Sequence, residues 1–140
     1  MKKLLLAIGL LALVILSLSS CSQPGGGAAT KGPITISSKA DTEGALLGQM
    51  IVAMLKANGF QVADKPAITG TSLIRKAILS GEIDLYPEYT GNGAYFFNEI
   101  GSEVWRDAQQ GYERVKKLDK EKNNIVWLKP APANNTWAIA

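Results

Sequence analysis

Residues 34–63, ITISSKADTEGALLGQMIVAMLKANGFQVA, decide the fold class of this chain. A short run rich in β-branched residues opens the stretch, and a second strand-like run closes it over residues 60–63. Between them, residues 42–58 predict a helix that ends at Gly59. Its apolar stripe consists of Leu46, Leu47, Met50, Ile51, Met54 and Leu55. A strand, a helix and a strand in this order predict a parallel pair with a crossover helix.

The same alternation continues after the second strand. Thr71 or Ser72 is placed to cap a helix, and Gly81 is placed to end it. Residues 83–86 predict a third strand. Pro87 limits that strand, because proline has no N–H to donate to a neighbouring strand.

The C-terminal third predicts a long helix and two further strands. Ser102 is placed to cap the helix, which ends near residues 123–124. Its apolar stripe consists of Val104, Ala108, Tyr112, Val115 and Leu118. Residues 125–128 predict a fourth strand, and residues 136–140 begin another after a proline-rich connection. We therefore expect an α/β fold with a parallel sheet, and the strand-like end without a polar tail predicts a fragment of a longer protein.

Residues 1–20 have the pattern of a secretion signal. Two lysines precede an apolar run over residues 4–16, which is shorter than the about 18 to 20 residues of an ordinary membrane span. Small residues then precede Cys21, as in a bacterial lipobox, where the cysteine is lipidated. We predict a lipoprotein signal peptide over residues 1–20, a lipidated cysteine and flexible linker over residues 21–32, and a domain over residues 33–140. The mature protein is then extracytoplasmic, in the periplasm or at the cell surface, and anchored to the bacterial membrane.

The composition excludes several classes of function. The chain has no histidine and a single cysteine, so it lacks the commonest metal ligand, the usual general base and any intrachain disulfide. Removal of residues 1–20 lowers the net charge from +3 to +1, which gives a nucleic-acid partner little electrostatic support. The G-x-x-x-x-G-K-[ST] phosphate-binding pattern does not occur. We expect no metal, no cofactor and no nucleic-acid partner.

The predicted fold indicates where a ligand binds. In open α/β sheets the site lies beyond the carboxyl ends of the strands, where helix N-termini also present N–H donors. The segments at those ends are residues 38–39, 70–72, 86–92 and 134–137, and each supplies polar donors, an aromatic ring or both. Tyr89 follows a proline and precedes T-G-N-G, so it is poor core material and we favour a ligand role for it.

Several long segments carry a resemblance to a known family. The segments SSKADTEGALLGQM, GEIDLYPEYTGNGAYFF, AQQGYERVKKLD and WLKPAPANNTWAIA resemble the first half of the substrate-binding proteins of osmoprotectant ABC importers. These proteins form the glycine betaine/carnitine/choline (OpuAC-type) family, and the chain is most similar to its OsmF (YehZ) subgroup. The resemblance implies a two-lobed clamp of periplasmic-binding-protein type II. Residues 33–140 would form its first lobe, with the second lobe largely missing.

The resemblance also implies a ligand site. A quaternary ammonium group has no N–H to donate, and each aromatic face that it contacts is worth about 0.5 to 2 kcal/mol. The family's Y-T-G-T cage motif corresponds to Tyr89 through Asn92, with Asn92 where many members have threonine. Trp137 stands where many members have tyrosine. The implied ligand-binding residues are Lys39, Thr71, Ser72, Tyr89, Asn92, Asn135 and Trp137.

The function implied by the resemblance is that of a lipid-anchored receptor. It would capture glycine betaine or a related quaternary ammonium solute and deliver it to an ABC permease and ATPase. The alternatives are an α/β enzyme that uses Lys39 with Asp84 or Glu88, a truncated remnant that binds nothing, and a binder of a different small solute. The sequence offers no nucleophile or electrophile near that acid pair, so we do not expect an enzyme. Tyr86 alternates with Leu85 and is predicted to lie in the core.

Overall fold

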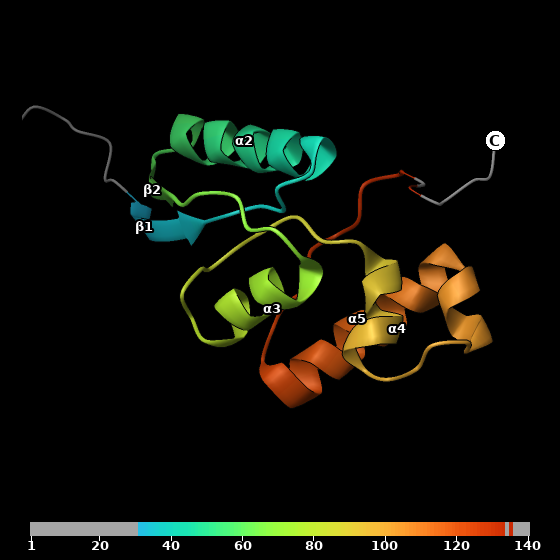
Figure 1. Cartoon of the computed structure of the whole chain (residues 1–140). Helices are drawn as coiled ribbons and strands as arrows, with labels where there is room; N and C mark the ends of the chain where they lie inside the picture. The colour runs from blue at the N-terminus through green and yellow to red at the C-terminus, as the bar shows by residue number, and fades with distance from the viewer. Residues whose placement is uncertain (1–30, 134, 136–140) are drawn as a thin grey trace, which may run out of the picture. The chain divides into compact units, whose positions relative to one another are not determined.

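The computed structural model describes residues 31–133 and 135, and its first half is a strand–helix–strand unit. β1 (Lys31–Ile36) and β2 (Phe60–Asp64) pair in parallel, and α2 (Thr42–Ala57) connects them (Figure 1). The predicted crossover unit is therefore confirmed.

Residues 83–86 run beside β1 in parallel, as predicted, but form a single bridge within the described part of the chain. The carbonyl of Thr35 accepts hydrogen bonds from the N–H groups of Asp84 at 2.8 Å and Leu85 at 3.3 Å. The N–H of Thr35 donates instead to Oδ2 of Asp84 at 2.7 Å. The Asp84 side chain thus takes the N–H of Thr35, and Pro87 has no N–H to donate. Residues 83–86 therefore do not extend into the full strand that was predicted.

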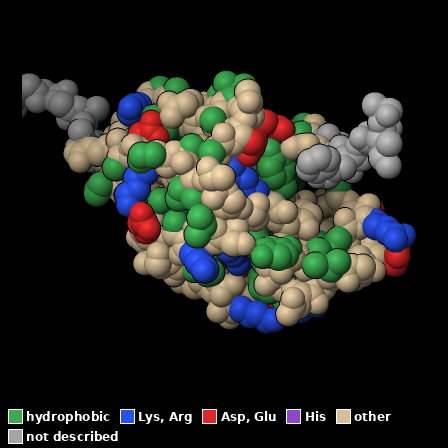
Figure 2. All heavy atoms as spheres, viewed as in Figure 1, with side chains coloured by type: hydrophobic (Ala, Val, Ile, Leu, Met, Phe, Trp, Pro, Cys, Tyr) green, Lys and Arg blue, Asp and Glu red, His purple; other side chains and the backbone are tan. Residues whose placement is uncertain are grey.

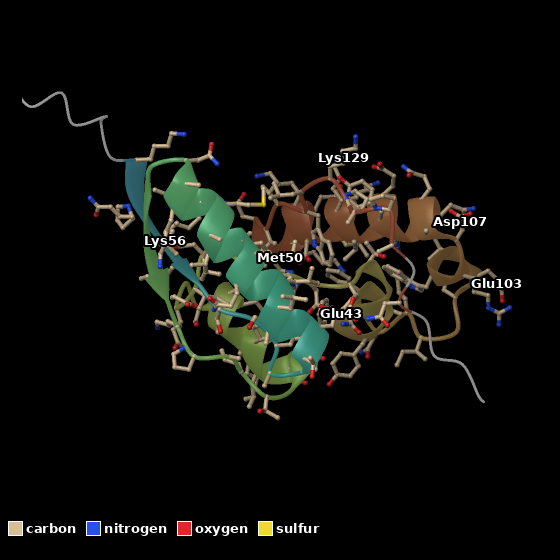
Figure 3. All side chains as sticks on the ribbon, turned by 90° about the horizontal axis from the view of Figure 1, so that it is seen from above. Glu43, Met50, Lys56, Glu103, Asp107 and Lys129 are labelled. Carbon is tan, nitrogen blue, oxygen red and sulfur yellow. The ribbon has the colours of Figure 1, made fainter. Side chains whose placement is uncertain are left out.

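Helix α2 presents a different face to the interior from the one predicted. The exposed fractions of Leu46, Met50 and Met54 are 61%, 52% and 64%, so half of the predicted apolar stripe lies on the surface. In Figure 3, which views the molecule from above, α2 runs across the near side with Met50 at its middle and Glu43 near its N-terminal end.

Small residues occupy the face of α2 that packs inward. The buried residues of the helix are Gly44, Gly48 and Val52. A Cβ atom on Gly48 would lie 2.6 Å from the Cβ of Ser38, which follows β1. The missing side chain therefore lets the helix backbone approach the end of β1 closely, and a bulkier residue would push the helix away.

Glycines stand near both ends of helix α3 (Thr71–Leu79). Its N-cap is Gly70 at φ +94°, and no side chain of the described residues caps it, so the capping predicted for Thr71 or Ser72 is wrong. Gly81 stands just past the C-terminal cap at φ +72°, a conformation that residues with side chains rarely adopt. The predicted end of this helix is confirmed.

Short helical turns precede a long helix in the second half of the described residues. η1 (Thr90–Asn92) leads into α4 (Gly93–Phe96), and η2 (Glu103–Arg106) precedes α5 (Ala108–Asn123). None of the helices described between residues 31 and 133 is long and apolar enough to span a membrane.

The long helix predicted from Ser102 is wrong at its start. The backbone at Asp107 is extended, at φ −105° and ψ 124°, and interrupts the helical path between η2 and α5. The Asp107 carboxylate caps α5 by accepting a hydrogen bond from the N–H of Gln110 at 2.8 Å. The predicted end is confirmed, because α5 ends at Asn123 and Asn124 adopts a left-handed φ of 55°.

Residues 125–128 were predicted to form a strand, and this prediction is wrong. They pair with no strand in the part of the chain that the structure describes. Val126 and Leu128 are exposed, and Nε1 of Trp127 donates to the Asp119 carboxylate at 2.6 Å. This bond holds the segment against α5 instead of at a sheet edge. The strand predicted at residues 136–140 lies outside the described residues.

One cluster of buried core residues lies between α3 and the segment that follows it. Ile74, Ala77, Ile83 and Tyr86 form a buried cluster, which confirms the core position predicted for Tyr86. In Figure 1, α2 lies on one side of the strands and α3 on the other, as expected for layers packed on a parallel sheet.

Candidate functional site

Two loops run side by side at the carboxyl end of β1. The Ser37 hydroxyl donates to the carbonyl of Pro66 at 2.8 Å, and the N–H of Ile68 donates to the carbonyl of Ser38 at 2.8 Å. Lys39 forms an isolated parallel bridge with Ile68. The end of β1 is thereby joined to the loop before α3, at the edge where α/β sheets bind ligands.

A cavity of about 330 Å³ lies at this junction. Its lining residues are Lys39, Ala40, Asp41, Thr69, Gly70 and Thr71. The Asp41 carboxylate caps α2 by accepting from the N–H of Gly44 at 2.8 Å. Lys39 and Thr71 therefore face the same cavity from different elements, as the sequence predicted for strand ends.

Glu88 is the centre of a buried hydrogen-bond network beside this cavity. Its Oε1 accepts hydrogen bonds from Nζ of Lys39 at 2.5 Å, from the N–H of Tyr89 at 2.7 Å and from Nδ2 of Asn92 at 2.7 Å. Its Oε2 accepts from the Tyr86 hydroxyl at 3.0 Å. The Glu88 side chain is 5% exposed and the Lys39 side chain 9%. The carboxylate therefore holds Lys39 and the loop of residues 86–92 in one arrangement.

Tyr86 links this network to the core. Burial raises the pKa of the Tyr86 hydroxyl far above its ordinary value, and the neighbouring Glu88 carboxylate raises it further. The hydroxyl therefore remains protonated across the physiological range and donates its hydrogen to Glu88.

The Tyr89 ring lies at the edge of the network. Nζ of Lys39 lies 4.9 Å from the centroid of the ring, within the range of a cation–π interaction. Burial raises the pKa of Tyr89, a hydrogen bond with Asn135 lowers it, and the charges of Glu43 and Asp41 raise it, with a net increase. Nδ2 of Asn135 donates to Oε2 of Glu43 at 2.8 Å. Tyr89 is thus a neutral ring in a charged neighbourhood.

The surface shows the same neighbourhood. In Figure 2, acidic and basic side chains lie close together near the right-hand end of α2, which is its N-terminal end in Figure 1.

The structure brings most of the predicted ligand-binding residues together. Lys39, Tyr89 and Asn92 surround Glu88, and Thr71 shares the cavity with Lys39. Asn135 lies beside Tyr89 through its bond to Glu43. Trp137, like the predicted lipid-bearing Cys21, lies outside the described residues.

Ser72 points to a different place. Its hydroxyl lies 3.1 Å from the hydroxyl of Tyr95, at a separate open cavity of about 600 Å³. That cavity is lined by Ser72, Arg75, Lys76, Leu79, Tyr95, Phe96, Phe97, Asn98, Lys122 and Asn123. The structure therefore does not place Ser72 with Lys39 and Tyr89.

Sequence reasoning did not assign Glu88 and Glu43 to the site. Glu88 was considered as half of an acid pair with Asp84, yet the Asp84 carboxylate bonds to the backbone of β1 instead. The available signal was the position of Glu88, an acid directly before Tyr89 in a stretch with few charges. Nothing in the sequence marks Glu43, because an acid in the first turn of a helix is common.

The arrangement suits binding better than bond making. An aromatic face, an ammonium group, an amide donor and a carboxylate meet at Lys39 and Glu88, beside the cavity that Lys39 lines. Among residues 31–133 and 135, no group of three or more aspartates, glutamates, histidines or cysteines is placed to hold a metal ion. Aromatic and polar groups converging on a small cavity are typical of ligand recognition.

Comparison with known proteins gives the family. Residues 32–140 match the family described as the substrate binding domain of ABC-type glycine betaine transport systems. The glycine betaine-binding protein YehZ of Escherichia coli K12 is 56% identical over 108 residues, which cover 77% of this chain and 35% of that protein. A glycine-betaine-binding protein of Pseudomonas aeruginosa is 37% identical over 107 residues, which cover 76% of this chain and 33% of that protein.

A solved structure supports the same assignment. The structure of apo YehZ from Escherichia coli matches with a TM-score of 0.73 and 55% identity, over 75% of this chain and 37% of that one. The match confirms the predicted α/β fold of the periplasmic-binding-protein type. The chain spans about a third of the length of the curated relatives it matches. Since the family match covers residues 32–140, the chain belongs to the substrate-binding domains of ABC-type glycine betaine transport systems, a family of transporter components and not of enzymes.

Proposed function

We propose that this protein captures glycine betaine or a related quaternary ammonium solute for an ABC importer. The ligand assignment rests on one observation about the Tyr89 ring. The ammonium group of Lys39 lies over the face of this ring, 4.9 Å from its centroid. A ring placed to attract one ammonium group can attract a trimethylammonium group by the same quadrupole. The family of the chain supports the solute class.

The proposed roles follow from the chemistry of each side chain. Tyr89 contacts the quaternary ammonium group, and Trp137 supplies a second aromatic face. Lys39 and Thr71, which share the cavity at the end of β1, contact a ligand carboxylate. Asn92 and Asn135, which lie beside Tyr89 or its network, complete the proposed polar contacts. Ser72 is left out of the proposed site, because its hydroxyl lies at the separate cavity beside Tyr95.

The proposal extends to the cellular setting. Residues 1–20 act as a lipoprotein signal peptide, residues 21–32 carry a lipid on Cys21 and a linker, and residues 33–140 belong to the first lobe of the binding domain. The protein is extracytoplasmic and anchored to the membrane. Its partners are an ABC permease and ATPase, to which it delivers the solute.

Isothermal titration calorimetry with glycine betaine tests the proposal, using the protein produced from its complete reading frame. We expect saturable binding by the wild type. Tyr89→Ala should weaken binding by about five- to thirtyfold, since a desolvated cation–π contact is worth about 1 to 2 kcal/mol.

Tyr95→Ala is the matched control, because it removes another tyrosine whose hydroxyl bonds at the separate cavity. It should leave the affinity unchanged. Unchanged affinity in Tyr89→Ala would remove Tyr89 from the site. Failure of the wild type to bind glycine betaine, carnitine or choline would refute the proposed function and favour a remnant without binding activity.

A further inference from the structure

Lys39 and Glu88 form an ion pair inside the proposed ligand site. Their charged atoms lie 2.5 Å apart, and both side chains are more than nine-tenths buried. The same Lys39 ammonium lies over the Tyr89 ring. A positive charge therefore stands where the cationic end of a solute is proposed to bind, and Glu88 is its counter-ion.

Like charges that share a small, partly buried pocket repel each other strongly. Without Glu88, a cationic solute at Tyr89 would face an unpaired lysine, unless the solute brought a carboxylate of its own. The remaining acids near Tyr89, Asp41 and Glu43, are engaged by the α2 N-terminus and by Asn135. Glu88 is the acid that bonds directly to Lys39 in the described residues.

Glu88 also fixes the geometry of the loop that carries Tyr89. Its Oε1 accepts from the backbone of Tyr89 and from the side chain of Asn92, and its Oε2 accepts from Tyr86 in the core. Charge-assisted bonds of this kind are short and directional, so the loop and the lysine are held together by one carboxylate.

We propose that Glu88 is a positioning residue and built-in counter-ion. It holds Lys39 beside the Tyr89 ring and cancels its charge, so that quaternary ammonium solutes bind whether or not they carry a carboxylate. This inference rests on the proposed function and adds to it the residue that lets a cationic solute bind next to the charge of Lys39.

The test compares choline and glycine betaine by calorimetry in the complete protein and in Glu88→Gln. Glutamine keeps the shape of the side chain and removes its charge. We expect choline affinity to fall about tenfold more than glycine betaine affinity, because the carboxylate of the zwitterion replaces the lost counter-ion. A purely structural role would lower both affinities by the same factor.

Glu82→Gln is the matched control, since it breaks an exposed Glu–Lys pair, with Lys65 at 3.1 Å, away from this network. This control should leave the ratio of choline affinity to glycine betaine affinity unchanged. If Glu82→Gln changed that ratio as much as Glu88→Gln does, the inference would be overturned. Equal losses for both solutes in Glu88→Gln, or no loss, would overturn the role of Glu88 while leaving the proposed function intact. A wild type that binds neither solute would refute both.

A second variant covers the case in which Glu88→Gln does not fold, since that change leaves Lys39 buried without a partner. The double variant Lys39→Met with Glu88→Gln removes both charges. Choline affinity should stay within about threefold of the wild type, because no lysine charge remains for Glu88 to cancel. A tenfold loss of choline affinity in this double variant would contradict the inference.

Discussion

The carboxylate of Asp119 is fully buried, yet side chains from several segments satisfy it. Both terminal nitrogens of Arg75 donate to it, one of them at 3.0 Å, with Asn123 at 2.8 Å and Trp127 at 2.6 Å. Burial raises the pKa of Asp119, but hydrogen bonds from Arg75, Trp127 and Asn123 outweigh burial and hold the pKa below its ordinary value. Asp119 therefore stays ionised and ties α5 to α3.

Asp119→Asn should lower the free energy of unfolding by about 3 to 5 kcal/mol at pH 7, because it leaves Arg75 buried without a counter-ion. The folded pKa lies below the unfolded value of about 3.9. The contribution of Asp119 is therefore complete above about pH 5 and is lost as the pH falls through 4 toward the folded pKa. Urea unfolding at pH 7, 5 and 3 should show that the difference in free energy of unfolding between wild type and variant becomes smaller at pH 3.

A surface pair provides the comparison for this prediction. Glu103 and Arg106 lie 2.9 Å apart on η2, and both are exposed. Glu103→Gln should change the free energy of unfolding by less than about 0.5 kcal/mol, because solvent screens such pairs. An Asp119→Asn variant as stable as the wild type, or a gap that stays constant with pH, would contradict the role given to Asp119.

At the scale of elements, α2 shows how packing selects among apolar faces. The stripe of Leu46, Met50 and Met54 has the helical period of a buried face, yet it is exposed. Val52 is 4% exposed and lies on the face of Gly44 and Gly48, where the backbone closely approaches the end of β1. The helical period therefore predicted that α2 has an apolar face. The face that packs inward is the one with Gly44 and Gly48, because the helix can approach β1 closely there.

The two faces of α2 predict opposite responses to substitution in the 140-residue chain. Val52→Ala should lower the free energy of unfolding by about 1 to 3 kcal/mol, because it removes buried methyl groups and leaves a cavity. Met54→Gln should change it by less than about 0.5 kcal/mol, because the side chain is already in water. Urea unfolding at pH 7 measures both, and a larger loss for Met54→Gln than for Val52→Ala would contradict the observed orientation of the helix.

At the scale of the whole molecule, the anchor and the binding domain are predicted to be joined by a short linker. Residues 21–32 are rich in glycine and other small residues, a composition typical of flexible connections. A lipid-bearing Cys21 would keep the binding domain at the membrane surface, near a permease, without a membrane-spanning helix.

Cys21→Ser should abolish acylation of the protein, because serine cannot carry the thioether-linked lipid. Growth of bacterial cells with a labelled fatty acid should mark the wild type and not the variant. Ser22→Ala is the control and should still take up the label. A Cys21→Ser protein that is labelled as strongly as the wild type would refute a lipid on this residue.

Local sequence signals predicted much of the fold. The period of residues 42–58 and the glycines at 59 and 81 located α2, α3 and their ends, because helix period and left-handed glycine conformations depend on near neighbours. The strand predicted at residues 125–128 failed because Trp127 bonds to Asp119 on α5, a contact that no period encodes. The sequence also did not predict the interruption of the helix at Asp107. An aspartate within a helical pattern looks like any other polar residue on the helix surface, so it does not mark a new helix start.

The sequence by itself determined the order of the elements, the family motif around Tyr89 and the absence of histidine chemistry. Tertiary structure alone decided the partners within the candidate site. Lys39 and Glu88 lie 49 residues apart in the chain, and they meet because the end of β1 and the loop after residues 83–86 reach the same edge of the fold. Residue spacing specifies local geometry, whereas the pairing of distant charges depends on how the elements pack, and so the centre of the site emerged only in three dimensions.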